Sequence, residues 1–166
     1  MSEELFFVPA LQRLDLVAPP VATVLRSWTG THSVEEFRVA EIDPDSAGGV
    51  DFCTRYGFKE TEGANCVVVM GQRGSKRTLA AVVIPVGRKT DFNRVVRQRL
   101  GARQVSLAPL ELVLAETNME YGSITPIGLP PSWPILIDAE VAQSPRIVIG
   151  SGLRHSKLSL PGPALL

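Results

Sequence analysis

The spacing of apolar residues predicts four helices. The clearest spans Pro19–Trp28, where apolar residues recur at i, i+3, i+4 and i+7 behind two prolines, and Gly30 follows its end. Proline in the first turn and glycine beyond the last are typical of an amphipathic helix. Three further helices are predicted at about residues 43–56, 91–100 and 109–114, the first two of them ended by Gly57 and Gly101.

Short apolar runs predict the strands. Cys66–Met70 and Leu79–Ile84 are rich in valine and are joined by Gly71–Arg77, which predicts a hairpin of buried, adjacent strands. Shorter strands are predicted at about residues 37–42, 104–107, 135–137, 147–149 and 158–160. Because strands and helices are mixed without strict alternation, we expect an α+β fold with a mixed, strongly curved, barrel-like β-sheet flanked by helices.

The length of 166 residues predicts one domain with a single core. We expect residues 1–34 to form a helical N-terminal extension packed on a domain of residues 35–166. The acidic start does not look like a secretory signal, and no apolar run is long enough to span a bilayer. Cys53 and Cys66 both fall in predicted regular elements, which is typical of buried thiols in a reducing compartment. The sequence therefore predicts a cytoplasmic protein without a membrane partner.

Charge is distributed unevenly although the net charge is zero. Residues 1–64 carry eleven acidic and five Lys or Arg residues, whereas residues 73–103 carry nine Lys or Arg residues and one acid. A neutral protein is not a general nucleic-acid coat, but this basic block predicts a face that contacts phosphates. The alternative is a pair of solvated faces whose charges pair with acids elsewhere in the fold.

The segment Met119–Pro130 holds the most unusual chemistry. It places two glycines and two prolines around Ser123 and Thr125. Proline fixes φ and glycine leaves the backbone bare, so a ligand can approach the N–H groups of such a loop closely. Taken alone, Gly122–Gly128 is better explained as a structural turn.

Other catalytic signatures are absent. The sequence has neither a Gly-x-Ser-x-Gly elbow nor a Walker A lysine pattern. His32 and His155 are too few and too badly spaced with the cysteines for a zinc site, so we expect no metal and no cofactor. Cys66 has no indicated base and is better explained as a core residue of a strand.

Five motifs then occur in a fixed order along about three quarters of the chain. They are Asp51–Gly57, Asn65–Val69, Ile84–Val86 followed by Asp91, Gly122–Gly128, and Ile135–Asp138 followed by Gly150–Gly152. In this order they resemble the YbaK/EbsC family of aminoacyl-tRNA deacylases, which includes the editing domain associated with prolyl-tRNA synthetase. The resemblance implies a YbaK-like fold and hydrolysis of the ester of a mischarged aminoacyl-tRNA in trans. Its implied partners are that tRNA and an aminoacyl-tRNA synthetase.

The resemblance also implies the site residues. The loop amides would stabilise an oxyanion, and a water would attack, assisted by a ribose hydroxyl of the substrate. The implied catalytic positions are Asn65, Gly122, Ser123, Ile124 and Thr125. The implied substrate-binding positions are Pro126, Gly128, Asp138, Ser151 and Gly152. From the basic block and the motif after Gly152, the expected tRNA-binding residues are Arg73, Lys76, Arg88, Lys89, Arg94 and Arg154.

Two of these positions keep alternatives open. Asp138 would also suit the N-cap of a short helix at residues 139–142. Asn65 stands where the family has a lysine that adds positive charge and helps to position the substrate. A neutral amide at this position is consistent with a slower enzyme, with a cation relocated to another part of the chain, or with an inactive binder. The rival functions are therefore a tRNA- or synthetase-binding module of the same fold and a hydrolase for another small ester or thioester.

Overall fold

The strands form two four-stranded sheets in a computed structural model that describes residues 1–166. The first sheet has the order β5-β3-β4-β6, with β3 at Ala64–Arg73, β4 at Lys76–Pro85, β5 at Gln104–Leu107 and β6 at Ile135–Ile137. The second has the order β1-β2-β8-β7, with β1 at Val8–Pro9, β2 at Arg38–Glu41, β7 at Ile147–Gly150 and β8 at Ser156–Leu160. A single parallel bridge joins Gly63, directly before β3 of the first sheet, to Val148 in β7 of the second.

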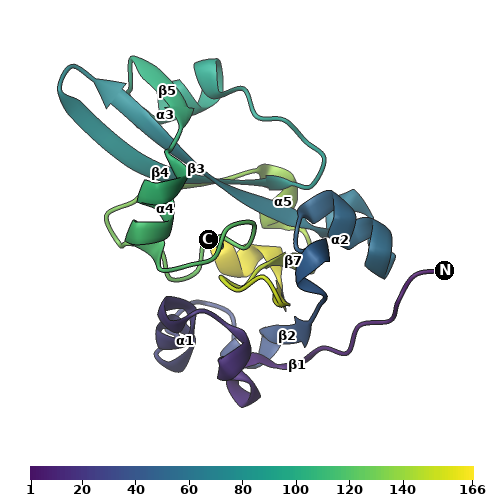
Figure 1. Cartoon of the computed structure of the whole chain (residues 1–166). Coiled ribbons are helices and arrows are strands. Elements are labelled where there is room, and N and C mark those ends of the chain that lie inside the picture. The colour runs from purple at the N-terminus through teal and green to yellow at the C-terminus, as the bar shows by residue number, and fades with distance from the viewer.

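The fold is α+β as predicted, but the single barrel-like sheet is a correction. The strands are divided between two sheets, neither of which closes on itself. In Figure 1 the teal β3–β4 hairpin extends away from the molecule with β5 and α3 beside its outer half, whereas β1 and β2 lie on the opposite side. Sequence alternation identifies strands but does not say which edges pair, and this is why one sheet was expected instead of two.

The β3–β4 hairpin confirms the predicted pair of adjacent antiparallel strands. Cys66 pairs with Val83 and Met70 with Leu79. Each strand has ten residues, so only Gly74 and Ser75 remain in the connection. Gly74 has a φ of 62°, which suits a tight two-residue turn. The connection is shorter than the predicted Gly71–Arg77, because polar residues at both ends of that segment continue the pairing of β3 with β4.

Helices occur close to the predicted positions. They are α1 at Pro19–Arg26, α2 at Gly49–Tyr56, α3 at Arg97–Leu100, α4 at Leu110–Thr117 and α5 at Ala139–Gln143. Gly57 and Gly101 end α2 and α3 with φ of 74° and 61°, in the left-handed region that favours glycine. α2 starts later than predicted because Pro44–Ser46 forms a separate 3-10 turn, and a π-helical turn at Phe92–Val96 precedes α3.

The main core lies between the two sheets and α1. It joins Val68 and Val83 of the first sheet to Ile149 and Leu158 of the second. The N-terminal segment supplies Leu16, Val21 and Leu25 of α1 and its approach to this core. None of the helices has the length and apolar content needed to cross a membrane.

Candidate functional site

A cavity of about 360 Å³ lies where the two sheets meet. Four parts of the chain border it: the start of β3, the turn before α2, the β5–α4 connection and the segment Met119–Pro130, called here the Gly/Pro loop. Its lining residues are Gly48, Gly49, Ala64, Asn65, Cys66, Val67, Val68, Leu107, Ala108, Leu110, Val113, Tyr121, Gly122, Ile124, Gly150 and Lys157. Small apolar side chains dominate this lining, and Lys157 is the only charged one. Such a cavity with few polar groups is typical of a ligand site.

The Gly/Pro loop is fixed by hydrogen bonds to the turn after β7. Ser123 donates its N–H to Glu120 O at 3.1 Å, and its own carbonyl accepts from Gly152 N–H at 2.8 Å. Gly122 has a φ of 79°, in the region that favours glycine. The N–H groups of Gly122 and Ile124 make no hydrogen bond to another backbone group. The loop therefore presents two free donors on a fixed frame.

Gly150 allows the loop to approach the sheet closely. A Cβ built on Gly150 would lie 2.6 Å from Ser123 O and 2.8 Å from Ile124 O, so only glycine fits. The carbonyl of Ser123 is directed toward Gly152, whose N–H it accepts. Because N–H and C=O of a trans peptide point in opposite directions, the N–H of Ile124 points away from Gly152.

Asn65 enters the cavity from β3. It pairs with Ile84 on β4, and its side chain lies against the first residue of α2. A Cβ at Gly49 would come within 2.5 Å of Asn65 Oδ1, so glycine makes room for the amide at the N-terminus of the helix. Asn65, Gly122 and Ile124 are thus the predicted site residues that the structure brings together around one cavity.

Lys157 enters the same cavity from β8. Its side chain is buried, with 5% of the residue exposed, and its Nζ donates to Ala47 O at 2.8 Å. The ammonium also lies 5.3 Å from the centre of the Phe52 ring. The pKa of Lys157 is lowered to about 8, chiefly by burial; Cys53 opposes the shift, and the Arg154 charge contributes to it.

Cys66 borders the cavity as an unreactive thiol. Burial raises its pKa to about 12, so the thiol stays protonated at neutral pH. The nucleophile of an ester hydrolysis in this cavity would therefore be water.

Several expected substrate-binding residues lie outside the cavity. Asp138 caps α5, where its Oδ1 accepts from Glu140 N–H at 2.9 Å, and it borders a different cavity with Arg88. Gly128 packs on α1, since a Cβ there would lie 2.8 Å from the carbonyl carbon of Pro20, and Pro126 is buried. The hydroxyls of Ser123 and Thr125 are buried without a hydrogen-bond partner and do not line the cavity.

Ser151 and Gly152 brace the loop from behind. The Ser151 hydroxyl is hydrogen bonded to the Ser156 hydroxyl at 2.6 Å and accepts from Leu153 N–H at 3.2 Å. Gly152 exchanges two hydrogen bonds with the loop, one to Ser123 O and one from Glu120 N–H, each of 2.8 Å. Their place in the structure is behind the Gly/Pro loop and not on the cavity surface.

Arg154 clamps the mouth of the cavity. Its guanidinium donates to Tyr121 O and to Pro44 O, both at 2.9 Å, and lies 5.9 Å from the centre of the Tyr121 ring. Its own N–H donates to Glu120 Oε1 at 2.8 Å. Tyr121 itself is 63% exposed. The arginine thus joins the turn before α2 to the Gly/Pro loop.

The expected tRNA-binding residues of the basic block are exposed and lie along the first sheet and its helical turn. Arg73 and Lys76 face each other at the tip of the β3–β4 hairpin, where Arg73 donates to Gly101 O at 3.1 Å. Arg88 is already paired with Glu140 at 2.8 Å. Lys89 lies in the connection after β4 and Arg94 in the π-helical turn at Phe92–Val96, and neither carries an ion pair.

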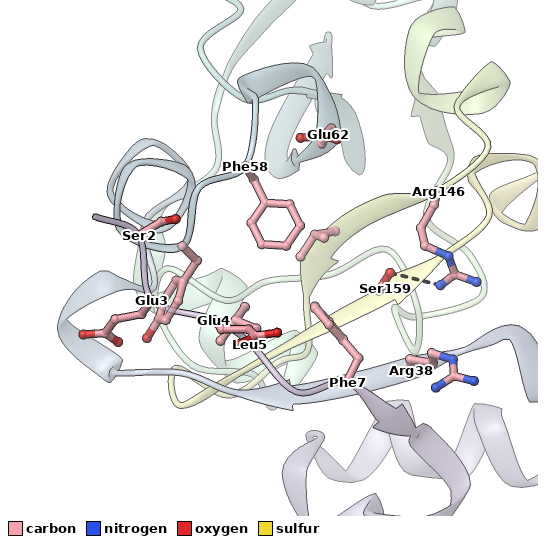
Figure 2. A pocket seen from close by; sticks show the side chains of 12 residues that line it. Ser2, Glu3, Glu4, Leu5, Phe7, Arg38, Phe58, Glu62, Arg146 and Ser159 are labelled. Atoms are coloured by element: carbon pink, nitrogen blue, oxygen red, sulfur yellow. Dashed lines mark hydrogen bonds between the residues drawn. The ribbon is translucent and has the colours of Figure 1, made fainter.

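A second cavity, of about 540 Å³, lies under the N-terminal segment. Figure 2 shows Phe7 and Phe58 inside it, with Arg38 and Arg146 toward one end and Ser2 and Glu3 toward the other. None of the predicted site residues lines this cavity. The cavity bordered by Asp138 and Arg88 has the same volume of about 540 Å³, so size does not identify the site. The loop amides and the buried lysine single out the smaller cavity of about 360 Å³.

Sequence reasoning missed Lys157, Gly49 and Tyr121. The predicted strand at 158–160 left Lys157 outside, and the observed β8 begins two residues earlier, at Ser156, which places the lysine in a buried strand where an unpaired charge is rare. Gly49 carried no signal of its own, since its role depends on where Asn65 places its amide. Tyr121 directly precedes the loop glycine, but its exposure is set by the three-dimensional fold.

Comparison with known proteins identifies the family and the fold of the chain. The family model of the aminoacyl-tRNA editing domain matches residues 43–166. A structure described as "a putative trans-editing enzyme for prolyl tRNA synthetase" superposes with a TM-score of 0.72 at 16% identity, covering 90% of this chain and 91% of that one. The structure of hypothetical protein APE2540 gives a TM-score of 0.69 at 22% identity, covering 78% and 83%. At these identities the two structures establish the fold.

Proposed function

The chain belongs to the aminoacyl-tRNA editing domain family, and from that premise we propose that it hydrolyses the ester of mischarged aminoacyl-tRNA in trans. The observation that carries the proposal is the cavity shared by Asn65 and the Gly122–Ile124 backbone. Two loop N–H groups without backbone partners belong to residues that line this mainly apolar cavity. Editing of tRNA is the property of the family, and deacylation is the step that these groups are suited to catalyse.

The loop amides would stabilise the oxyanion. Attack of water on the ester carbonyl forms a carbon–oxygen bond and moves negative charge onto the carbonyl oxygen. Donors held in place by the Ser123–Gly152 hydrogen bond need no reorganisation to receive that charge. Collapse then breaks the bond to the ribose oxygen, and a proton from the water passes to that oxygen. The products are the free amino acid and tRNA with its terminal hydroxyls restored.

The mouth of the cavity would receive the tRNA end. Leu107, Leu110 and Tyr121 are exposed apolar or aromatic side chains that line it. An exposed aromatic ring is a common stacking platform for an unpaired base. We assign Tyr121 this role for the terminal adenine. Arg154 would hold the residue in place through its hydrogen bond to the main-chain carbonyl of Tyr121. The interior has no acidic side chain and contains the Lys157 ammonium, which disfavours a cationic amino-acid side chain.

A second candidate function is a binding module of the same fold. Asn65 favours it, because a neutral amide replaces the lysine of the family and cannot supply charge. In that case the cavity would hold the aminoacyl end of tRNA, or a synthetase would dock at its mouth, without turnover.

A deacylation assay separates the two. The purified chain is incubated with a panel of mischarged tRNAs and, as matched controls, with the same tRNAs carrying their correct amino acid. We expect at least one mischarged tRNA to lose its amino acid faster than in buffer while its control does not. Saturable binding to the panel without faster deacylation would support the binding module instead.

A further inference from the structure

We propose that Lys157 is a catalytic residue whose ammonium stabilises the oxyanion together with the loop amides. The inference rests on the deacylase function proposed above. It assigns the site a cation on β8 of the second sheet, whereas Asn65 lies on β3 of the first. Three observations support it: Lys157 is buried, it lies on the same face of the sheet as the loop, and no other charged side chain lines the cavity.

The burial of Lys157 has no structural compensation of the usual kind. Lysine is almost never fully buried unless an acid pairs with it. Lys157 has no carboxylate within salt-bridge distance, and the carbonyl of Ala47 is its one hydrogen-bond acceptor in the protein. A charge buried in this way is costly, and a core position that only needed volume would suit an apolar residue better. Such a group is a candidate for function.

The strand register directs Lys157 toward the loop. Lys157 on β8 is paired with Gly150 on β7, so the two residues project from the same face of the sheet. On that face the missing side chain of Gly150 is replaced by the Ser123–Ile124 backbone, which packs directly on it. The lysine and the loop therefore approach the cavity from the same face, and both line it.

The groups around Lys157 leave it as the single charge inside the cavity. Asn65 is neutral, and burial raises the pKa values of both Cys53 and Cys66, so both remain thiols. Tyr121 lies at the mouth, and Arg154 is held by Tyr121 O and Pro44 O. The N-terminus of α2 at Gly48–Gly49 also borders the cavity and adds partial positive charge. Because Lys157 is buried, its ammonium acts on a developing oxyanion more strongly than it would in solution.

The competing explanation is a tether. Through Ala47 O, Lys157 holds the turn that leads into α2, and its replacement could act by moving Gly48 and Gly49. Lys157→Gln separates these roles, because glutamine keeps an N–H donor for Ala47 O and removes the charge. Lys157→Met removes both. Lys59→Met is the matched control, since Lys59 is an exposed lysine that does not line the cavity.

The experiment measures kcat/KM for deacylation of the preferred mischarged tRNA from pH 6.5 to 9.5, corrected for hydrolysis in buffer. We expect Lys157→Gln and Lys157→Met to lower kcat/KM by about 10²–10³-fold, the cost of losing one oxyanion donor. Lys59→Met should leave it unchanged. Wild-type kcat/KM should fall as the pH rises past about 8, where the ammonium loses its proton, and both Lys157 variants should lack this limb.

Three results would overturn the proposal. An active wild type with Lys157→Gln within about threefold of it would leave the deacylase intact and reduce Lys157 to a tether. A wild-type rate that rises with pH to a plateau above 8 would assign the neutral amine as a base instead. A wild type inactive on every mischarged tRNA would refute the proposed function itself, and this inference with it.

Discussion

Asn65 and Lys157 line one cavity although they belong to different sheets, Asn65 to β3 and Lys157 to β8. The two residues are 92 positions apart in the chain, and the packing of the two sheets brings them to the same cavity. A positive charge is therefore present beside the neutral amide. This relationship favours a relocated cation over a site that lacks one.

The charge at position 157 changes what Asn65→Lys should do. From the sequence alone, a lysine at position 65 would restore the family's charge and raise the rate. With Lys157 in the same cavity, two ammonium groups would repel each other, so we expect Asn65→Lys to leave the rate unchanged or lower it. The double variant Asn65→Lys/Lys157→Gln should be more active than Lys157→Gln alone. A single Asn65→Lys variant several times faster than wild type would contradict this expectation.

Gly122→Val should reduce deacylation by at least about 10²-fold, because it distorts the loop that presents the oxyanion donors. Gly122 has a φ of 79°, and a Cβ there would lie 2.7 Å from the Arg154 guanidinium. Gly74→Val is the matched control, since Gly74 has a φ of 62° with nothing within 4 Å of a Cβ and lies in the hairpin turn. Both variants carry backbone strain of about 1–3 kcal/mol. Because Gly74 adjoins Arg73 and Lys76, the comparison uses the rate at saturating tRNA, and only Gly122→Val should lose kcat. Equal activity losses at the two glycines would indicate a global effect.

Arg154→Met should shift the pH dependence of the reaction. The Arg154 charge lowers the pKa of Lys157, so its removal should raise that pKa and move the falling limb of kcat/KM to higher pH. Arg154→Lys keeps the charge and should leave the limb in place while weakening the clamp on Tyr121 and Pro44. A limb that stays at the same pH in Arg154→Met would show that the two charges do not interact.

Stability should rise with pH in the range where Lys157 titrates. The pKa of Lys157 is lowered to about 8 in the folded protein from an ordinary value of 10.5. Between these values the unfolded chain binds more protons than the folded one, so the free energy of unfolding increases with pH. Relative to Lys157→Met, the wild type should gain up to about 3 kcal/mol from pH 7 to 10.5. Parallel stability curves, measured by urea unfolding, would contradict a desolvated ammonium.

Binding of tRNA should depend on salt through the exposed part of the basic block. Lys76 carries no ion pair at the hairpin tip, whereas Arg88 is paired with Glu140. We therefore expect Lys76→Ala to lower the slope of log K against log salt by about one unit, and Arg88→Ala to lower it less. Fluorescence anisotropy with a labelled tRNA measures both slopes. The salt concentration is varied from about 50 to 200 mM, the range over which phosphate contacts lose most of their affinity. Affinity that is independent of salt would argue against phosphate contacts by this block.

Local pattern was sufficient for most elements of the fold. Valine-rich runs identified the β3–β4 hairpin, and glycines marked the ends of α2 and α3. The two-residue β1 and the division into two sheets were not predicted, because strand pairing depends on contacts distant in sequence. The parallel β4–β6 pair, 81–83 with 135–137, is another contact of this kind.

The candidate site was predictable only in part. Family motifs pointed to Asn65 and Gly122, which line one cavity, but they also pointed to Asp138, which caps α5 at another cavity. Motif order records position along the chain and not the face of the sheet on which a side chain lies. Lys157 was missed for the opposite reason, since it lies in an ordinary strand and gains its significance from the loop packed on Gly150.

Single-turnover deacylation of a mischarged tRNA, with enzyme in excess, tests the central claim most directly. Wild type, Gly122→Val and Lys157→Gln are compared with buffer on the same tRNA preparation, and binding is measured in parallel. We expect the wild type to release the amino acid well above the buffer rate. Both variants should still bind tRNA but release the amino acid at least about 10²-fold more slowly than the wild type. Wild type that binds the whole panel and releases no amino acid faster than buffer would contradict it.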